Sequence, residues 1–327
     1  MYYDGNQTLT YNALFNFIVG NRGAGKTYWS KHWAIRDFIK TGAQFVYVRR
    51  YKQELKKNKL FFADILHEFP EHKLEVKGME YYIDGQLAGV ALPLSTSKIE
   101  KSTPFPRVNK IIFDEFIIDR GTYHYLADEV VNFLELYETV ARMRDVRVFF
   151  LSNAITQTNP YFLYFKIRLP KNNQKVYRTG DILLQLVGNE EFIQAKKKTR
   201  FGQLIQGTSY GDYAIDNQFL RDDESFISKK AGTARHSFTF VYKGQSFGVW
   251  TDYTEGRIWV SMDVDPSCPY KYALTLDEHR PNTMLIKRLS AVPVFKSFID
   301  NYKLGNVYFE NMTCKNVAYE AIRLILI

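Results

Sequence analysis

The chain has 327 residues, of which 46% are hydrophobic and 16% aromatic, and its formal net charge is +9. This composition excludes a disordered chain, allows one large and one smaller domain, and favours polyanionic partners. Two cysteines cannot form a disulfide framework, and with six scattered histidines they do not form a zinc-binding pattern. No apolar run approaches the roughly 20 residues that cross a bilayer, so we expect a soluble protein without a membrane partner.

The first half of the chain alternates short apolar runs with longer helical patterns. The apolar runs are residues 15–19, 45–48, 90–94, 111–113 and 148–151. This alternation predicts an α/β fold with a mostly parallel sheet and covering helices. Residues 74–87 interrupt it, and Asp84-Gly85 in this strand-rich context predicts an inserted hairpin.

The second half is organised differently. We expect a first domain at residues 1–195, a linker at 196–227, where periodicity is weak, and a second domain at 228–327. The second domain is expected to contain three alternating strands from His236 onward with turns at Lys243-Gly244 and Glu255-Gly256, a helix at 283–289, a strand at 307–310 and a helix from Lys315. This βββαβα order predicts an RNase H-like α+β domain.

The segment Gly20-Asn-Arg-Gly-Ala-Gly-Lys-Thr27 fits the GxxxxGK(S/T) phosphate loop, between an apolar run and a helical pattern. Backbone amides around Gly20, Gly23 and Gly25 would wrap the phosphates. Lys26 would reach the β and γ oxygens, and Thr27 would bind magnesium. The motif therefore predicts ATP and Mg²⁺ as cofactors, against the alternative of a glycine-rich turn. Arg22 is either a phosphate contact or a solvated loop residue.

The apolar run at 111–113 ends in Asp114 and Glu115. Asp114 is expected to hold magnesium through water, and Glu115 to act as the general base that activates the attacking water. Such a base is typical of an enzyme that hydrolyses ATP.

The run at 148–151 leads to Asn153, which is either a sensor of the γ-phosphate or a turn residue. If the strand at 148–151 lies beside the phosphate loop, it indicates the additional-strand class of ATPases, which usually work as rings. The preceding helical segment ends in Arg142-Met-Arg144. We prefer Arg142 as an arginine that completes a neighbouring subunit's site, although both arginines also suit a helix C-terminus.

Two basic segments are candidates for nucleic-acid contact. The first follows the second apolar run and contains Arg49, Arg50, Lys52, Lys56, Lys57 and Lys59. The second is the loop with Lys98, Lys101 and Arg107. Such contacts would be to phosphates and independent of sequence, but basic runs are also common on solvated helix faces.

Cleavage of nucleic acid is not expected from the second domain. RNase H-like nucleases hold metals with carboxylates that include one on the first strand, and residues 236–242 contain none. The nearby acids Asp252, Asp263, Asp265 and Glu310 occur at expected strand ends and turns, where acids are common.

The chain resembles the packaging ATPases of the φ29 group of phages, which have an FtsK/HerA-like motor core. The matching segments are the phosphate loop, Phe45-Val-Tyr-Val-Arg-Arg-Tyr-Lys52, Tyr82-Ile-Asp-Gly85, Phe113-Asp-Glu-Phe116, Leu151-Ser-Asn-Ala154, Asn159-Pro-Tyr-Phe162, Lys198-Thr-Arg-Phe-Gly202, Asp216-Asn-Gln-Phe219 and Gly248-Val-Trp250. The resemblance implies a pentameric ring on the portal vertex that moves double-stranded DNA and stacks on a packaging RNA. It also implies a location in the host cytoplasm, at the procapsid only transiently and absent from the mature virion.

The resemblance implies for Lys26, Thr27, Asp114, Glu115 and Asn153 the same roles as those given above. It also matches Arg142 to the family's trans-acting arginine. It places Lys101 in a DNA-facing loop, with Lys52 and Arg120 as further positions, and implies a degenerate nuclease as the last domain. The main alternative is another P-loop translocase, such as a helicase or a conjugative pump. A GTPase is disfavoured because Asn58-Lys59 is followed by Leu60-Phe61 and not by the guanine-binding x-Asp.

Overall fold

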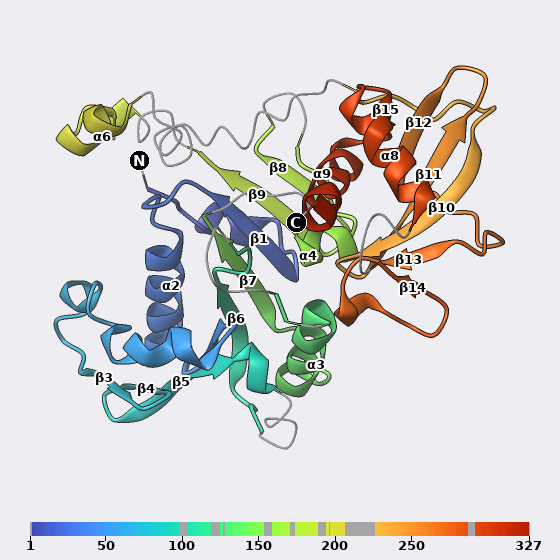
Figure 1. Cartoon of the computed structure of the whole chain (residues 1–327). Coiled ribbons are helices and arrows are strands. Elements are labelled where there is room, and N and C mark those ends of the chain that lie inside the picture. The colour runs from blue at the N-terminus through green and yellow to red at the C-terminus, as the bar shows by residue number, and fades with distance from the viewer. Residues whose placement is uncertain are drawn as a thin grey trace. The chain divides into compact units, whose positions relative to one another are not determined.

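The computed structural model describes residues 2–97, 104–118, 125–126, 128–153, 159–170, 174–188, 194–195, 197–206, 226–286 and 292–326. The chain divides into two compact units (Figure 1). One consists of Met1–Thr156 with Arg168–Leu220, and the other of Gln157–Ile167 with Arg221–Ile327. Within the described ranges, the structure has no helix with the length and apolar character needed to span a bilayer.

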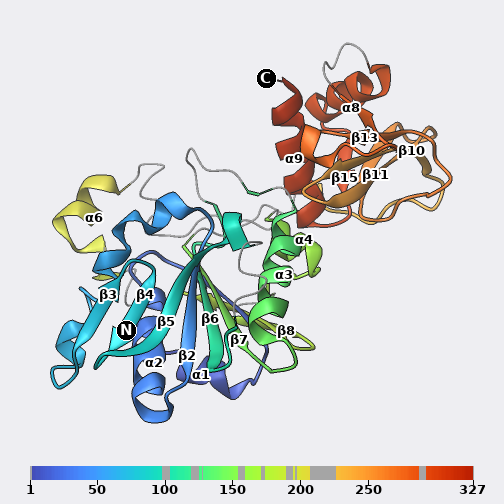
Figure 2. The same cartoon turned by 90° about the horizontal axis from the view of Figure 1, so that it is seen from below.

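The first unit is built on a nine-stranded sheet in the order β3-β4-β5-β2-β6-β7-β1-β9-β8 (Figure 2). Neighbouring strands from β5 to β9 in this order are parallel, whereas β3 and β4 at one end and β8 at the other pair antiparallel. The prediction of an α/β fold with a mostly parallel sheet is confirmed. The strands are β1 Phe15–Gly20, β2 Gln44–Arg49, β3 Leu74–Lys77, β4 Glu80–Ile83, β5 Gln86–Pro93, β6 Val108–Asp114, β7 Arg147–Ser152, β8 Val176–Thr179 and β9 Ile182–Val187.

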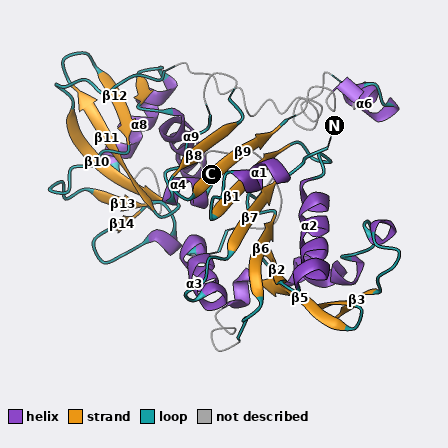
Figure 3. Ribbon diagram, turned by 180° about the vertical axis from the view of Figure 1, so that it is seen from behind, coloured by secondary structure: helices purple, strands orange, loops and turns teal. Residues whose placement is uncertain are grey.

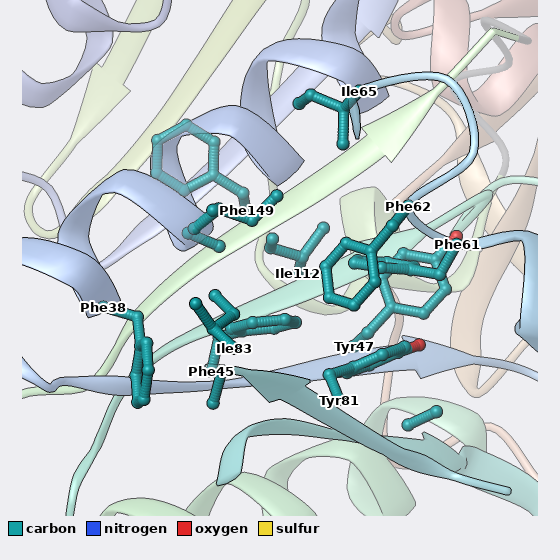
Figure 4. Close-up of a cluster of buried hydrophobic side chains, with 14 of the residues drawn as sticks. Phe38, Phe45, Tyr47, Phe61, Phe62, Ile65, Tyr81, Ile83, Ile112 and Phe149 are labelled. Atoms are coloured by element: carbon teal, nitrogen blue, oxygen red, sulfur yellow. The ribbon is translucent and has the colours of Figure 1, made fainter. Parts of the chain in front are cut away.

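Helices cover both faces of this sheet, so residues of β6 and β7 alternate between two apolar layers. On one face Ile112 and Phe149 join a buried cluster with α2 (Figure 4). On the other, the rings of Phe113 and Phe150 lie 5.7 and 4.8 Å from that of Phe133 in α3. The helices of this unit are α1 Asn6–Thr10, α2 Lys26–Thr41, the 3-10 helices η1 Lys52–Leu60 and η2 Leu66–Glu68, α3 Glu129–Ala141 and α6 Arg200–Ile205.

Two hairpins flank the parallel core. The predicted one is confirmed: Asp84 and Gly85 join β4 to β5 with φ of 50° and 75°, as a type I′ turn requires. The other hairpin, β8–β9, was not predicted, and its strand β9 pairs in parallel with β1. A Cβ atom at Gly20 would come within 1.8 Å of the Val187 carbonyl oxygen in β9, so this position requires glycine.

The second unit contains a six-stranded sheet in the order β14-β13-β10-β11-β12-β15, which α8 and α9 cover on one face (Figure 3). The three expected strands and their two turns are confirmed as antiparallel β10, β11 and β12. The elements are α4 Pro160–Tyr164, β10 Arg235–Tyr242, β11 Gln245–Asp252, β12 Arg257–Ser261, β13 Lys271–Ala273, η5 Leu276–Glu278, β14 Met284–Leu285, α8 Pro293–Lys303, β15 Val307–Phe309 and α9 Met312–Leu326.

The expected helix at 283–289 is wrong. Met284 and Leu285 form β14, which pairs in parallel with Tyr272 and Ala273 of β13. This long-range pairing overrides the local helical pattern, and the helix begins at Pro293, which suits a first helical position. Residues 287–291 lie outside the described part.

Candidate active site

The phosphate loop joins β1 to α2 at the carboxyl edge of the parallel strands. Gly23 and Gly25 have φ of 85° and 87°, in the left-handed region that favours glycine. Lys26 is only 4% exposed, and its ammonium donates to the carbonyl oxygens of Gly20 at 3.0 Å and Asn21 at 2.9 Å. The loop thus surrounds a buried cation and lies at a helix N-terminus, a combination suited to phosphate.

Asn153 follows β7, and its Oδ1 accepts a hydrogen bond from Lys26 Nζ at 3.0 Å. This contact is possible because β7 lies between β1 and β6, the position that the additional-strand prediction requires. Burial lowers the pKa of Lys26 from 10.5 to about 8, while the nearby Asp114 carboxylate opposes the shift. A polyanion beside Lys26 would raise this pKa again, because it favours the charged form.

Thr27 and Asp114 face each other across the loop. The Thr27 hydroxyl lies 3.2 and 3.3 Å from the two carboxylate oxygens, and the Tyr47 hydroxyl donates to Asp114 Oδ2 at 2.8 Å. Burial, reinforced by Asp114, raises the pKa of Tyr47 well above its ordinary value, so Tyr47 remains a neutral donor. A hydroxyl and an acidic carboxylate this close form an oxygen donor set of the kind Mg²⁺ prefers.

Glu115 is held by Arg49, which was not predicted to belong to the site. Arg49 Nη2 donates to Glu115 Oε2 at 2.6 Å and to Glu54 Oε1 at 2.8 Å, and its Nη1 lies 3.7 Å from Asp114 Oδ2. The Glu115 backbone has a φ of 57°, and its side chain is 52% exposed. The missing information was the strand order, because β2 and β6 lie side by side in parallel and therefore end together.

Arg50 points away from solvent and forms a buried ion pair. Its Nε and Nη2 each donate to Glu129 at 2.8 Å, and both residues are 2% exposed. Further donations from Arg50 reach the carbonyl oxygens of Glu115 and Phe116 at 3.2 and 2.5 Å. The pair connects the end of β2 to the start of α3 and fixes the backbone of the expected general base.

We expect Glu129→Gln to lower the free energy of unfolding by about 3–5 kcal/mol, because it leaves the Arg50 charge buried without its counter-ion. The matched control is Glu75→Gln, which breaks a 3.0 Å pair with Lys73, whose side chain is 73% exposed, and should cost about 0–1 kcal/mol. Urea denaturation measures both. Equal losses would contradict the structural role of the Arg50 pair.

The remaining basic candidates divide by position. Lys52, Lys56, Lys57 and Lys59 are exposed on η1, and Arg22 is exposed on the phosphate loop. Lys98, Lys101 and Arg120 lie outside the described residues. The basic run after β2 thus has two parts: Arg49 and Arg50 are used inside the unit, whereas its lysines face solvent.

Arg142 and Arg144 are both exposed but differ in their contacts, because the Arg144 guanidinium donates to the backbone carbonyl oxygens of Val108 and Val140. Arg142 caps the end of α3, its side chain is exposed, and none of the residues that the structure describes hydrogen-bonds to its guanidinium. Arg142 lies in the turn between α3 and β7, at the amino end of β7. The phosphate loop lies beside the carboxyl end of β7, so Arg142 lies at the opposite edge of the sheet. A six-residue strand separates these edges by about 20 Å. Arg142 therefore does not reach the phosphate loop of its own subunit.

In the second unit, the acids considered for metal binding have other contacts. Asp252 accepts from Thr233 Oγ1 at 2.6 Å and the Thr254 amide at 2.8 Å, and Glu310 accepts from Ser261 Oγ at 2.6 Å. Asp263 pairs with Lys230, and Asp265 bonds to Ser267. In the described part of the chain, no three His, Cys, Asp or Glu side chains are grouped to hold a metal ion.

A model of the podovirus DNA encapsidation protein (Gp16) family matches residues 1–327. The chain belongs to this family. The resemblance to the φ29 group is thereby confirmed. Two relatives from phages agree with this assignment. The DNA packaging protein of Bacillus phage phi29 is 41% identical over 324 residues, which are 99% of this chain and 97% of the relative. The DNA packaging protein of Bacillus phage B103 is 40% identical over 316 residues, which are 96% of this chain and 98% of the relative.

Solved structures of relatives agree with this assignment. A chain of the bacteriophage Phi-29 viral genome packaging motor assembly is 41% identical, with a TM-score of 0.75 and coverage of 99% of both chains. The N-terminal domain of the DNA packaging ATPase from bacteriophage phi29 is 45% identical, with a TM-score of 0.56, and covers 58% of this chain and 98% of that one. This chain thus matches the family model over residues 1–327 and matches a relative's solved structure over 99% of its length.

Proposed function

We propose that this chain is an ATPase that couples ATP hydrolysis to the movement of double-stranded genomic DNA through the portal into a procapsid. The observation that carries the proposal is the group of Lys26, Thr27, Asp114, Glu115 and Asn153 at one edge of the sheet, in a chain of the encapsidation family. Family membership favours packaging over a helicase or a conjugative pump.

ATP and Mg²⁺ are the cofactors that these side chains fit. Lys26, Gly20, Arg22, Gly23 and Gly25 belong to the loop that would hold the phosphates, while Thr27 and Asp114 would hold the metal. When bound, Mg²⁺ neutralises charge on the phosphate oxygens. Glu115, oriented by its 2.6 Å contact with Arg49, orients the attacking water and accepts its proton.

The active form in this proposal is a homo-oligomeric ring, pentameric by resemblance, seated on the portal and a packaging RNA. Arg142 would act on the neighbouring subunit, since the turn that carries it lies at the edge opposite its own phosphate loop. Lys52 and Lys56, with Lys101 and Arg120 by resemblance, would contact DNA phosphates, so DNA-stimulated activity should fall with salt. The chain would work in the host cytoplasm, transiently at the portal vertex, and be absent from the mature virion.

We also propose that residues 1–195 form the motor domain, 196–227 a linker and 228–327 an RNase H-like domain without nuclease activity. The order β12-β11-β10-β13-β14, with β10 parallel to β13, supports this fold. The lack of a carboxylate on β10 supports the lost activity. Metal-dependent cleavage of DNA by the purified full-length chain would contradict it.

Nucleotide binding should be coupled to proton uptake at Lys26. With a pKa of about 8, the folded chain loses this charge as pH rises through 8, and bound phosphates would raise the pKa again. Affinity for a non-hydrolysable ATP analogue is therefore expected to fall above pH 8, by up to about tenfold per pH unit. Calorimetry at pH 9 in buffers of different ionisation enthalpy should detect nearly one proton taken up per site, and far less at pH 7. Equal uptake at both values would contradict the assignment.

The proposed function is tested by ATP-dependent DNA uptake into purified procapsids. Protection of DNA from nuclease should require this protein, ATP and an intact Lys26. The matched inactive control is Lys26→Ala, which removes the ammonium from the phosphate loop. Uptake that is equal with the wild-type and Lys26→Ala chains would overturn the proposal.

A further inference from the structure

We propose that Arg144 is a positioning residue: it holds the turn that presents Arg142 to the neighbouring subunit. This inference rests on the proposed trans action of Arg142. It assigns different roles to two arginines that are separated by one residue.

The guanidinium of Arg144 is bonded to backbone carbonyl oxygens from two segments. Nη1 donates to Pro106 at 3.0 Å and Val108 at 2.6 Å, and Nη2 donates to Phe105 and Val140, each at 2.6 Å. The first three oxygens belong to the residues that lead into β6, and the fourth to the last turn of α3. Arg144 therefore ties the α3–β7 turn to the start of β6.

The turn needs such an anchor because its backbone is not in a relaxed conformation. Arg142 has φ 52° and ψ −111°, values that a side-chain-bearing residue rarely adopts. Met143, between the two arginines, is fully exposed, so the turn projects from the surface of its unit. Such a conformation persists only where neighbouring groups hold it on both sides, and Arg144 supplies these contacts.

The same contacts argue against Arg144 as the trans-acting arginine. Reaching another subunit would require its guanidinium to leave carbonyl oxygens that it contacts at 2.6 to 3.0 Å. A planar guanidinium presents five donors in a fixed fork, and an ammonium cannot reproduce this geometry. The site thus accounts for arginine at position 144 without any contact to nucleotide.

Arg144→Gln should reduce the kcat of ATP hydrolysis at least tenfold and leave the KM for ATP within twofold of wild type. A displaced Arg142 would stabilise the transition state less, whereas the binding of ATP in the ground state would be unaffected. Arg144→Lys should give an intermediate kcat. The matched control is Arg147→Gln, which removes a 2.6 Å bond to Asn12 near the same turn but should leave kcat unchanged. Circular dichroism and thermal unfolding of each variant verify the fold.

A double-mutant cycle distinguishes positioning from direct catalysis. If Arg144 acts only through Arg142, the variant Arg142→Ala/Arg144→Gln should hydrolyse ATP no more slowly than Arg142→Ala alone. Multiplicative losses would show an independent catalytic role and overturn the inference, as would a wild-type kcat for Arg144→Gln. Activity retained by Arg142→Ala would instead overturn the proposed trans arginine, so the two failures are distinguishable.

Discussion

Replacing Glu115 with Gln is expected to reduce steady-state ATP hydrolysis by about 100-fold or more, the contribution of a general base. The amide keeps the size of the side chain and a hydrogen-bond acceptor for Arg49, but it cannot accept the proton of the attacking water. Binding of a fluorescent ATP analogue should remain close to wild type, since Lys26 and Thr27 are untouched. Phosphate release and analogue titration measure the two effects separately.

The matched control is Glu54→Gln, because Glu54 also accepts a hydrogen bond from Arg49, at 2.8 Å. Glu54 lies in η1, outside the predicted catalytic group, so this variant should keep most of the hydrolytic activity. Undiminished turnover in Glu115→Gln would contradict the catalytic assignment and favour a phosphotransferase, which needs no water-activating base. Equal losses in both variants would assign the effect to Arg49 and not to the base.

Arg142→Ala is the second change with a large expected effect. It should reduce hydrolysis by about 10³-fold, the lower end of the range for an arginine that stabilises the transferring phosphoryl group. The loss should be repaired in trans. When Arg142→Ala subunits are mixed with Lys26→Ala subunits on procapsids, an intact phosphate loop meets an intact arginine at some interfaces, and hydrolysis should return.

The control for this experiment is a mixture of Arg142→Ala with the double variant Lys26→Ala/Arg142→Ala. No interface in that mixture combines both groups, so no activity should return. Assembly on procapsids is measured by cosedimentation in every mixture. If assembled mixtures of the two single variants remain inactive, Arg142 does not act across a subunit boundary.

Much of the first unit follows from local sequence. Short apolar runs predicted β1, β2, β5, β6 and β7, since strands covered on both faces are continuously apolar. Asp84-Gly85 predicted its hairpin, because both residues tolerate positive φ. The prediction failed at residues 283–289, where pairing with β13 decided the conformation, and it missed β9, which lies against the phosphate-loop strand.

The phosphate loop could be predicted from local sequence, because Gly20, Lys26 and Thr27 lie in one short segment whose spacing is typical of that motif. The different environments of the arginines became evident only from the fold. Arg49 faces Glu115 and Arg50 faces Glu129. Arg142 and Arg144 are both exposed, but the structure gives backbone hydrogen bonds only for the Arg144 guanidinium. Charge and spacing cannot distinguish these neighbours, since their partners come from strands and helices that the order of the sheet brings together.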